Sequence, residues 1–529
     1  MVRRKRRRSG HPTVLHVQRG SASLAERVRK VGADHFGILA VDCHKDRFAV
    51  LLANFQGQVL MDLRVVENTG PELASLVEEV KRQAERHGLA DLVVALERTG
   101  RYYRPIQAVL QPHWPILMVH PFATKQLRQP ADPGNKTDRT DLLAMVRAVQ
   151  VGFTTADADL PARWAEWRLV SRWREDLIRK RAETRVQAQE RLEALLPGYT
   201  RCFKEIWDAP AALAIAVGYP SAAAILEAGS DGLRACLGEA HRLARAKTVA
   251  RALDWARQAS PADPAAELNH ELFCEQIKLL CAMEPAIYAQ EMRLFDYLVD
   301  TPFVLLTSLP GINVASSASY AAELGPLEHY LGPKKIAGRA GLYPSRSQSD
   351  QTDHANGPLV THRNARLRDA ILEIAHNLIQ CNEYFKAWAR DRRDRGWSDK
   401  RLHVAVARKF TRISYSMVGG RMVFWHPSSA GRDAILPKLY RFGIKQGIAP
   451  EALRDALLRA ARQIPPAFHK AEAETLEPLL PRQPQGPSRR ARKPGPEPIS
   501  AILVDVMRYL VLGRPVPEER SEPNRPVNP

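Results

Sequence analysis

Five apolar segments between residues 36 and 120 constrain the fold of this chain more than any other feature. The first three, "FGILAVD", "RFAVLLANF" and "QVLMDLRVV", have the length and composition of strands, and a short "QGQ" turn joins the second to the third as a hairpin. The other two, "DLVVALE" and "PILMVH", are continuous apolar runs typical of buried strands. The amino-terminal part of the chain is therefore predicted to be built around a sheet.

Helical segments separate these strands. "PELASLVEEVKRQAERHG" has apolar residues at helical spacing and ends on a glycine, as helices often do, and a shorter helix is expected near residues 102–110. Three antiparallel strands, a helix, and two further strands with helices between them predict an α/β layer fold of the ribonuclease H type.

The remainder of the chain is predicted to be mostly helical. Residues 161–196 carry a stripe of tryptophan, leucine and valine, and a second long helix over about 267–298 is expected to return antiparallel to it, as in a coiled coil. Between them lies an alanine-rich insert, 208–266, whose packing the sequence leaves open. The "LPG" turn at 309–311 either offers its backbone amides to a phosphate or simply ends a helix.

These patterns divide the chain into five parts. They are a basic flexible arm, a ribonuclease H-like α/β domain, a helical segment with an insert, a mostly helical carboxy-terminal domain, and a helical and Pro/Arg-rich extension: 1–34, 35–155, 156–300, 301–425 and 426–529. The extension contains "LPRQPQGPSRRARKPGPEP", which has the composition of a flexible basic linker, and ends in a short apolar helix, "ISAILVDVMRYLVLG".

The charge balance points to an anionic partner. Lys and Arg number 78 against 58 Asp and Glu, which gives a formal net charge of +20 and a pI near 9.9. Such a field attracts polyanions and favours nucleic acid as the partner. The "RRKRRR" of the arm either lies on phosphates or is a solvated tail.

The cysteines and the apolar runs bear on location. The six cysteines form no CxxC pair, which favours neither a disulfide framework nor a zinc ribbon and fits a reducing cytosol. No apolar run reaches the roughly 18 residues of a membrane helix, and no secretory h-region follows the basic start. A soluble, cytoplasmic protein with no membrane partner is expected.

Four carboxylates fall where a metal site can gather them. Asp42 ends the first predicted strand, Glu97 ends the fourth, and Asp138 and Asp141 lie at i and i+3 on the helix after the fifth. Strand ends converge on one edge of a sheet, and i,i+3 spacing puts two side chains side by side. Mg²⁺ takes oxygen ligands, and phosphodiester chemistry often uses metals held by clustered carboxylates, so a Mg²⁺ site is expected. Taken singly, each carboxylate also fits a helix cap, a solvated charge or an ion-pair partner.

Several motifs together resemble a known family. "AVDCHKDRFAVLL", "ALERTGRYY" and "NKTDRTDLLAM", followed by "LPGINVASSASYAAELG" and "AGLYPSRSQSD", are similar, in the same order, to the DEDD transposases of insertion sequences, the bridge-RNA-guided serine recombinases. The resemblance covers about residues 36–153 and 301–420. It implies a RuvC-like ribonuclease H-fold domain, a coiled-coil segment, and a serine-containing transposase domain over 301–425.

The resemblance assigns roles to individual residues. The residues that correspond to the RuvC-like metal-binding tetrad are Asp42, Glu97, Asp138 and Asp141. The family has a serine some five residues beyond the proline of a Gly-Leu-x-Pro motif, and Ser349 stands there. That serine attacks the scissile phosphate and forms a phosphoserine link with DNA, which requires a base or metal nearby. From the residues alone Ser349 is also a turn serine, and Ser345 and Ser347 compete with it.

Two departures from the family pattern stand near the serine. Asp350 replaces the usual glycine, and its charge repels a phosphate unless a metal or an arginine screens it. "THRN", Thr361 to Asn364, replaces a Ser-Lys-x-Gly run, and His362 contacts phosphate as the lysine does only when protonated. Basic side chains near both blocks are expected to contact nucleic acid: Lys136, Arg139, Arg346, Arg363, Arg366 and Arg368.

Together these inferences predict a transposase that cleaves and rejoins DNA at element ends and at a target. It is expected to use Mg²⁺, to work as a homo-oligomer (a dimer or tetramer), and to carry a structured guide RNA whose base pairing selects the sequence. Two alternatives remain open: a RuvC-like endonuclease that hydrolyses DNA with water, and a non-catalytic nucleic-acid-binding descendant. The last would be marked by loss of a tetrad residue, and all four are present.

Overall fold

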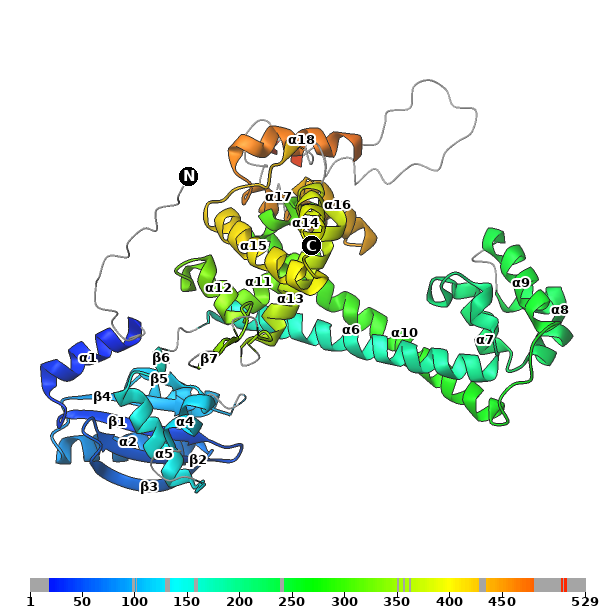
Figure 1. Cartoon of the computed structure of the whole chain (residues 1–529). Coiled ribbons are helices and arrows are strands. Elements are labelled where there is room, and N and C mark those ends of the chain that lie inside the picture. The colour runs from blue at the N-terminus through cyan, green and yellow to red at the C-terminus, as the bar shows by residue number, and fades with distance from the viewer. Residues whose placement is uncertain are drawn as a thin grey trace, which may run out of the picture. The chain divides into compact units, whose positions relative to one another are not determined.

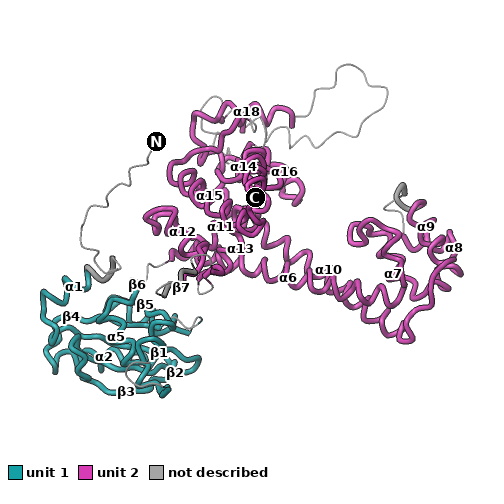
Figure 2. Tube along the Cα trace, viewed as in Figure 1, with its two compact units in different colours: residues 1–159 teal, residues 160–529 magenta. Residues whose placement is uncertain are grey.

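The chain forms two compact units, Met1–Asp159 and Leu160–Pro529 (Figure 2). The computed structural model describes residues 19–97, 100, 102–128, 134–156, 160–237, 242–349, 352–354, 357–360, 363–427, 434–479, 506, 507, 509 and 510. Several predicted features lie outside these residues: the first 18 residues of the basic arm, the linker at 480–498, most of the last helix, Asp350, Thr361 and His362.

A six-stranded mixed sheet forms the core of the first unit (Figure 1), with the strand order β3-β2-β1-β4-β5-β6. The strands are β1 (Phe36–Cys43), β2 (Arg47–Asn54), β3 (Val59–Glu67), β4 (Asp91–Glu97), β5 (Ile116–Val119) and β6 (Thr154–Ala156). β2 is antiparallel to both β1 and β3, β4 and β5 run parallel to β1, and β6 is antiparallel to β5. The predicted mixed α/β domain is confirmed. β6 was not predicted, because three residues carry too little alternation to be recognised.

Helices cover both faces of this sheet, because its central strands are apolar on both sides. They are α1 (Arg19–Val31), α2 (Gly70–Arg86), α3 (Arg104–Leu110), α4 (Pro121–Arg128) and α5 (Asp138–Gln150). α2 and α3 pack with Leu39 and Val41, whereas α1 and α5 pack with Ile38 and Ala40. Successive side chains of a strand point to opposite faces, so Asp42 belongs to the row that faces α5.

Two long helices of 34 residues each, α6 (Ala162–Leu195) and α10 (Ala266–Val299), lie side by side in the second unit (Figure 1). Their ion pairs join Arg163 to Asp300, Arg174 to Glu291 and Arg181 to Glu284. Rising residue numbers on one helix meet falling numbers on the other, so the pair is antiparallel, as predicted. At about 1.5 Å per residue each helix is about 51 Å long.

The alanine-rich insert forms a helical head at one end of this pair (Figure 1), with α7 (Pro210–Gly218), α8 (Ala222–Cys236) and α9 (Arg242–Ala256). The head has a hydrophobic cluster of its own, to which α6 contributes Leu192 and α10 contributes Phe273. Within the described residues, no single helix has the length and apolarity to cross a membrane. Only α7 and α8 taken together do, as a pair bent by 118°.

The rest of the second unit packs around one larger core. Its helices are α11 (Val314–Leu324), α12 (Pro333–Arg339), α13 (Ala365–Cys381), α14 (Glu383–Asp394), α15 (Asp399–Gly419), α16 (Ile435–Lys445), α17 (Pro450–Ala461) and α18 (His469–Leu476). Leu436, Leu453 and Leu476 of the extension are fully buried in the same cluster as Ile371 and Phe410. The mostly helical carboxy-terminal region is confirmed, and the described part of the extension belongs to its core.

Lys438 of the extension contacts backbone carbonyl groups in and next to the predicted "LPG" turn. Its Nζ donates hydrogen bonds to the carbonyl oxygens of Thr307 (2.6 Å), Leu309 (3.1 Å) and Ile312 (3.1 Å). Gly311 has a φ of +97°, and a Cβ there would lie 2.8 Å from the carbonyl oxygen of Asn377. The carbonyl groups of the turn thus bind a lysine, and its glycine packs against α13, which favours the interpretation as a connection between helices.

Glu472 of α18 predicts a pH dependence of stability. Its two carboxylate oxygens accept hydrogen bonds from the backbone N–H groups of Ile435 (2.8 Å) and Leu436 (2.9 Å). Burial raises the pKa of Glu472 to about 7. Because the folded protein then holds this proton more tightly than the unfolded chain, the contribution of Glu472 to the free energy of unfolding falls as pH rises from about 4.3 towards 7.

We expect that fall to amount to roughly 3 kcal/mol, measured by urea unfolding at a series of pH values. Glu472→Gln should flatten the pH profile over this window. Glu474→Gln, a neighbour on the same helix whose side chain is 64% exposed, should leave the profile unchanged. A Glu472→Gln protein with the wild-type profile would contradict the prediction.

Candidate active site

The sheet brings two carboxylates to the same edge. β1 and β4 are parallel, with Val41 opposite Leu96, so the next residues, Asp42 and Glu97, lie side by side at the carboxyl ends of neighbouring strands. Both continue rows of side chains that face α5: Ile38, Ala40 and Asp42 on β1, and Val93, Ala95 and Glu97 on β4. The predicted convergence of the two strand ends therefore follows from register and alternation.

The amino terminus of α5 supplies two more carboxylates. Thr137 is the N-cap: its hydroxyl accepts a hydrogen bond from the N–H of Thr140 (3.2 Å), and the Thr140 hydroxyl accepts one from the N–H of Thr137 (3.0 Å). The cap makes Asp138 the first helical residue and puts Asp141, only 8% exposed, about one turn further on. Carboxylates in a first turn are also favoured by the helix dipole.

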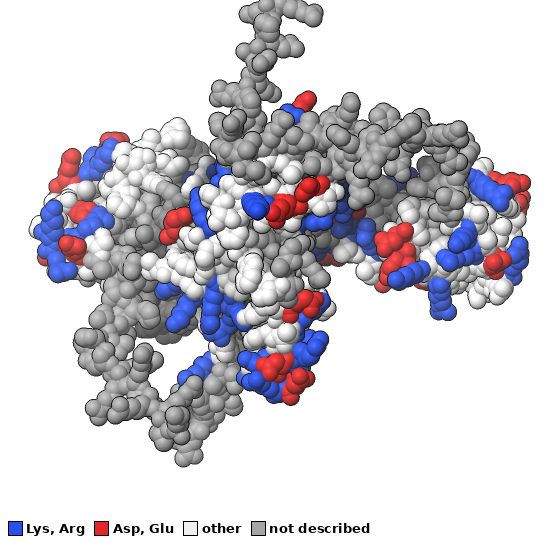
Figure 3. Space-filling view, turned by 90° about the horizontal axis from the view of Figure 1, so that it is seen from above, with Lys and Arg blue, Asp and Glu red and all other residues white. Residues whose placement is uncertain are grey.

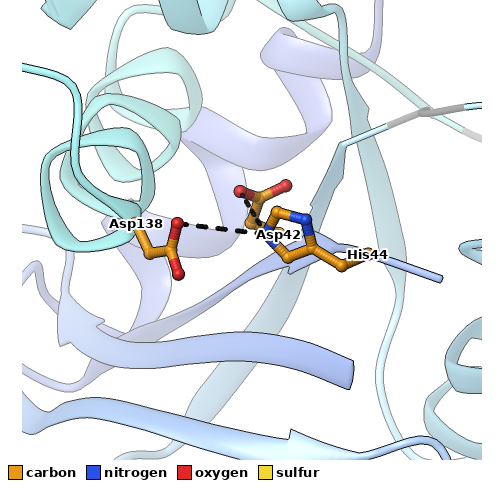
Figure 4. Close-up of side chains that lie close together, drawn as sticks. All are labelled: Asp42, His44 and Asp138. Atoms are coloured by element: carbon orange, nitrogen blue, oxygen red, sulfur yellow. Dashed lines mark ion pairs between the residues drawn. The ribbon is translucent and has the colours of Figure 1, made fainter. Parts of the chain in front are cut away.

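A histidine lies between the strand and the helix. Figure 4 shows one nitrogen of the His44 ring facing both carboxylates, with Nε2 at 3.5 Å from Oδ2 of Asp42 and 3.9 Å from Oδ1 of Asp138. One ligand atom from each of the three residues lies within 4.8 Å of the other two. β1 and α5 thus present two carboxylates and an imidazole to one small volume.

Burial and neighbouring carboxylates raise the pKa of two members of this group, Asp42 and Glu97. Burial raises the pKa of Asp42, and the charges of Asp141 and Asp138 raise it further, whereas His44 lowers it. Burial also raises the pKa of Glu97, with Asp42 and Asp141 adding to the effect. The four carboxylates therefore form one electrostatic cluster, whose repulsion a bound cation would relieve.

Three other side chains hold this cluster in place. Thr124 of α4 donates a hydrogen bond to Oε2 of Glu97 (2.6 Å). Arg128, also on α4, forms an ion pair with Asp141 in which both side chains are almost buried. Lys136 lowers the pKa of Glu97 through its positive charge.

The donor set fits a divalent cation. Hard ions such as Mg²⁺ prefer carboxylate oxygens, and Mn²⁺ also accepts imidazole. Asp42, Asp138 and His44 offer such atoms within 4.8 Å of one another, and Glu97 contributes charge from the same edge of the sheet. Asp141 is ion-paired with Arg128, and its charge still raises the pKa of both Asp42 and Glu97.

The serine of the second motif block lies in the other unit. Ser347 and Ser349 begin and end β7 (Ser347–Ser349), which pairs with β8 (Thr352–His354) so that Ser349 faces Thr352. Ser345 lies nearer the base of this hairpin, where its N–H donates to the carbonyl of Pro358 (2.8 Å). The structure thus gathers the four carboxylates in the first unit and places Ser349 in the second.

Comparisons with known proteins match both units. A DEDD transposase model described as "Transposase" matches residues 39–200, and a model described as "Transposase IS116/IS110/IS902 family" matches residues 304–390. A protein of Streptomyces clavuligerus, "Insertion element IS116 uncharacterized 44.8 kDa protein", is 23% identical over 394 residues, which cover 73% of this chain and 95% of the relative. Both models describe transposases, and the chain is similar to this transposase family in each of the two matched regions. The first match spans all four carboxylates of the transposase, and the second spans Ser349.

A transposase acts on DNA, so the partners of its predicted basic contacts matter. Arg366 donates to Glu175 and Asp176 of α6, each at 3.0 Å. Arg368 donates to the carbonyl oxygens of Ala340 (2.8 Å) and Val360. These two guanidinium groups are therefore engaged inside the transposase.

The other predicted basic residues are more accessible. Lys136 and Arg346 are exposed, as is Arg139, whose Nε donates to Asp62 (2.9 Å). Arg363 is exposed and donates to the hydroxyl of Tyr343 (3.2 Å), with other N–H groups left for a ligand. These four side chains remain the better candidates for nucleic-acid contact.

Sequence reasoning missed three residues of the transposase site. His44 carried a recognisable signal, because it stands two residues beyond Asp42 and the period of a strand turns both to one side. Thr124 and Arg128 are i and i+4 on α4 and so share a face, but only the packing of α4 aims that face at Glu97 and Asp141.

Proposed function

We propose that this transposase cleaves and rejoins DNA at the ends of an insertion sequence and at its target, using a RuvC-like metal site and a serine nucleophile. The observation that carries the proposal is the convergence of the carboxylates of β1, β4 and α5 at one edge of the sheet. The proposed metal-binding tetrad is Asp42, Glu97, Asp138 and Asp141. The strand order, with three antiparallel strands followed by two parallel ones, supports a ribonuclease H-like fold.

Mg²⁺ is the proposed ion, and when bound it would neutralise charge on the scissile phosphate. Asp42 and Asp138 would bind it, with Glu97 oriented for the same task by Thr124. Lys136 is exposed beside the cluster and would attract the DNA backbone towards it.

Ser349 is the proposed nucleophile. Its Oγ would form a bond to the scissile phosphorus while the bond from phosphorus to the leaving deoxyribose oxygen breaks. The serine gives up its proton, and the leaving oxygen takes one up. A free hydroxyl of another strand end then attacks the phosphoserine, which restores a phosphodiester and releases the serine, so no external energy source is needed.

The guide RNA and the homo-oligomer, a dimer or tetramer, are proposed on the resemblance alone. The net charge of +20 supports a large nucleic-acid partner. RNA guidance would assign sequence choice to base pairing and leave the protein to bind backbone.

A metal-dependent nuclease that hydrolyses DNA with water is the second candidate. It is favoured by one observation: the four carboxylates lie within the first unit and need nothing from the hairpin of Ser349. In that case cleavage would proceed with no link between protein and DNA.

Metal removal tests the proposed site. We expect the purified transposase, with co-expressed RNA and element-end DNA, to cleave with Mg²⁺, to stop after chelation, and to recover when Mg²⁺ is restored. Mg²⁺ or Mn²⁺ should also raise the melting temperature of the DNA-free protein, because an ion that binds only the folded state stabilises it. Cleavage that persists in excess chelator would overturn the metal site.

A further inference from the structure

A ladder of alternating cations and aromatic rings runs along the α14–α15 pair. In order, its members are Arg401, Trp397, Arg392, Trp388, Lys409 and Tyr384. The successive distances from a guanidinium carbon or Nζ to a ring centroid are 4.0, 5.7, 5.0, 5.1 and 4.4 Å. Each ring but the last therefore contacts a cation on either side, and the cations are held in order without losing their charge.

Arg401, at one end of this cation–aromatic ladder, also belongs to a row of arginines on α15, here called the arginine face. Arg401, Arg408 and Arg412 are spaced by seven and four residues, so they lie on one side of the helix, and all three are exposed. Val406 and Phe410 occupy the opposite, buried side. At about 1.5 Å per residue the three arginines extend over about 16 Å.

Positive charge on this arginine face is not cancelled locally. Within the described residues, none of the three arginines has a carboxylate at ion-pair distance, whereas Arg393 pairs with Asp399 and Arg395 pairs with Asp391. Residues 383–412 hold ten Lys and Arg against four Asp and Glu. Figure 3 shows Lys and Arg side chains gathered in several groups on the face in view, with Asp and Glu side chains among them.

The chemistry of the face suits a phosphate backbone. Unpaired guanidinium groups recognise phosphate oxygens with directed hydrogen bonds, and the ladder reduces the side-chain entropy that ordering its cations would otherwise cost on binding. Trp397 and Trp388 each lie beside two cations, which leaves less of their ring surface to stack on unpaired bases. Backbone contact with a duplex therefore fits better than binding of a single strand.

We propose that Arg401, Arg408 and Arg412, with the ladder beside them, hold the phosphate backbone of duplex DNA. The inference rests on the proposed function for the identity of the partner, and it adds a DNA-holding surface in the second unit, apart from the carboxylate cluster of the first. It requires neither the metal nor Ser349.

Equilibrium binding tests the proposal. The full-length variant Arg401→Gln/Arg408→Gln/Arg412→Gln is compared with wild type by fluorescence anisotropy on a labelled DNA duplex in chelator. We expect the Kd to rise about tenfold or more near 0.1 M salt, and the slope of log K against log salt to become shallower by about 2 to 3. The matched control is Arg201→Gln/Arg234→Gln/Arg257→Gln, three exposed arginines of the head and its junction with α6, which should bind as wild type.

Three results would overturn the proposal. The α15 variant could bind the DNA duplex with wild-type affinity, or the control variant could lose as much affinity as the α15 variant. The α15 variant could also lose affinity for an RNA duplex but not for the DNA duplex. If the triple variant has a lower melting temperature than wild type, the DNA affinity of the double variant Arg408→Gln/Arg412→Gln is measured instead, because this variant leaves the ladder intact. Because the assay is run in chelator, it measures DNA binding without metal-dependent cleavage. A protein that never cleaves DNA but binds it through the α15 arginines would therefore count against the proposed function alone.

Discussion

Asp42→Asn should lower the rate of DNA strand cleavage by about three orders of magnitude or more, because a metal supplies several kcal/mol of charge stabilisation in phosphoryl transfer. Asparagine keeps the shape of the side chain but removes the charge that holds a cation between β1 and α5. The measurement is the initial cleavage rate on labelled element-end DNA in Mg²⁺.

The same substitution should leave the melting temperature unchanged or higher. Burial and two neighbouring carboxylates disfavour the charge of Asp42, as its raised pKa shows, so its removal relieves repulsion in the folded state. Asp62→Asn serves as the control, because Asp62 is an exposed carboxylate of the same unit that pairs with Arg139. Near-normal cleavage by Asp42→Asn would remove Asp42 from the proposed metal site.

Ser349→Ala should abolish the covalent protein–DNA adduct altogether, because alanine has no oxygen with which to form a bond to phosphorus. The adduct is detected as labelled DNA that migrates with the denatured protein. Ser347→Ala is the matched control, since Ser347 lies at the other end of the same strand and pairs with His354. DNA binding should persist in both variants.

The two serine variants separate the candidate reactions. An adduct that survives Ser349→Ala and disappears in Ser347→Ala or Ser345→Ala would move the nucleophile within the hairpin. Cleavage without any adduct, equal in wild type and Ser349→Ala, would leave a metal-dependent nuclease.

The sheet could be predicted because each strand is recognisable from its own short stretch of sequence. Each of the five predicted strands carries enough apolar residues to be recognised by itself, and the alternation of β1 and β4 already puts Asp42 and Glu97 on one side. Asp138 and Asp141 required only the spacing of one helix turn.

Contacts between distant segments were not predictable. Arg366 was expected to bind phosphate, yet it binds Glu175 and Asp176, some 190 residues away in the chain. A guanidinium takes whichever anion the fold brings near, and composition does not reveal which one that is. The same reason explains why Arg128 was missed, and why the sequence did not reveal that Lys438 and Glu472 of the extension help to build the core.

The long α6–α10 pair has a consequence for how such proteins diversify. The head at its end has a hydrophobic cluster separate from the core that carries α11 to α18. Lineages can therefore enlarge, shorten or exchange the head between Leu195 and Ala266 with little disturbance to the larger core. The paired helices thus carry a separate domain at their end, and we expect the chain lengths of relatives to differ mainly in this head.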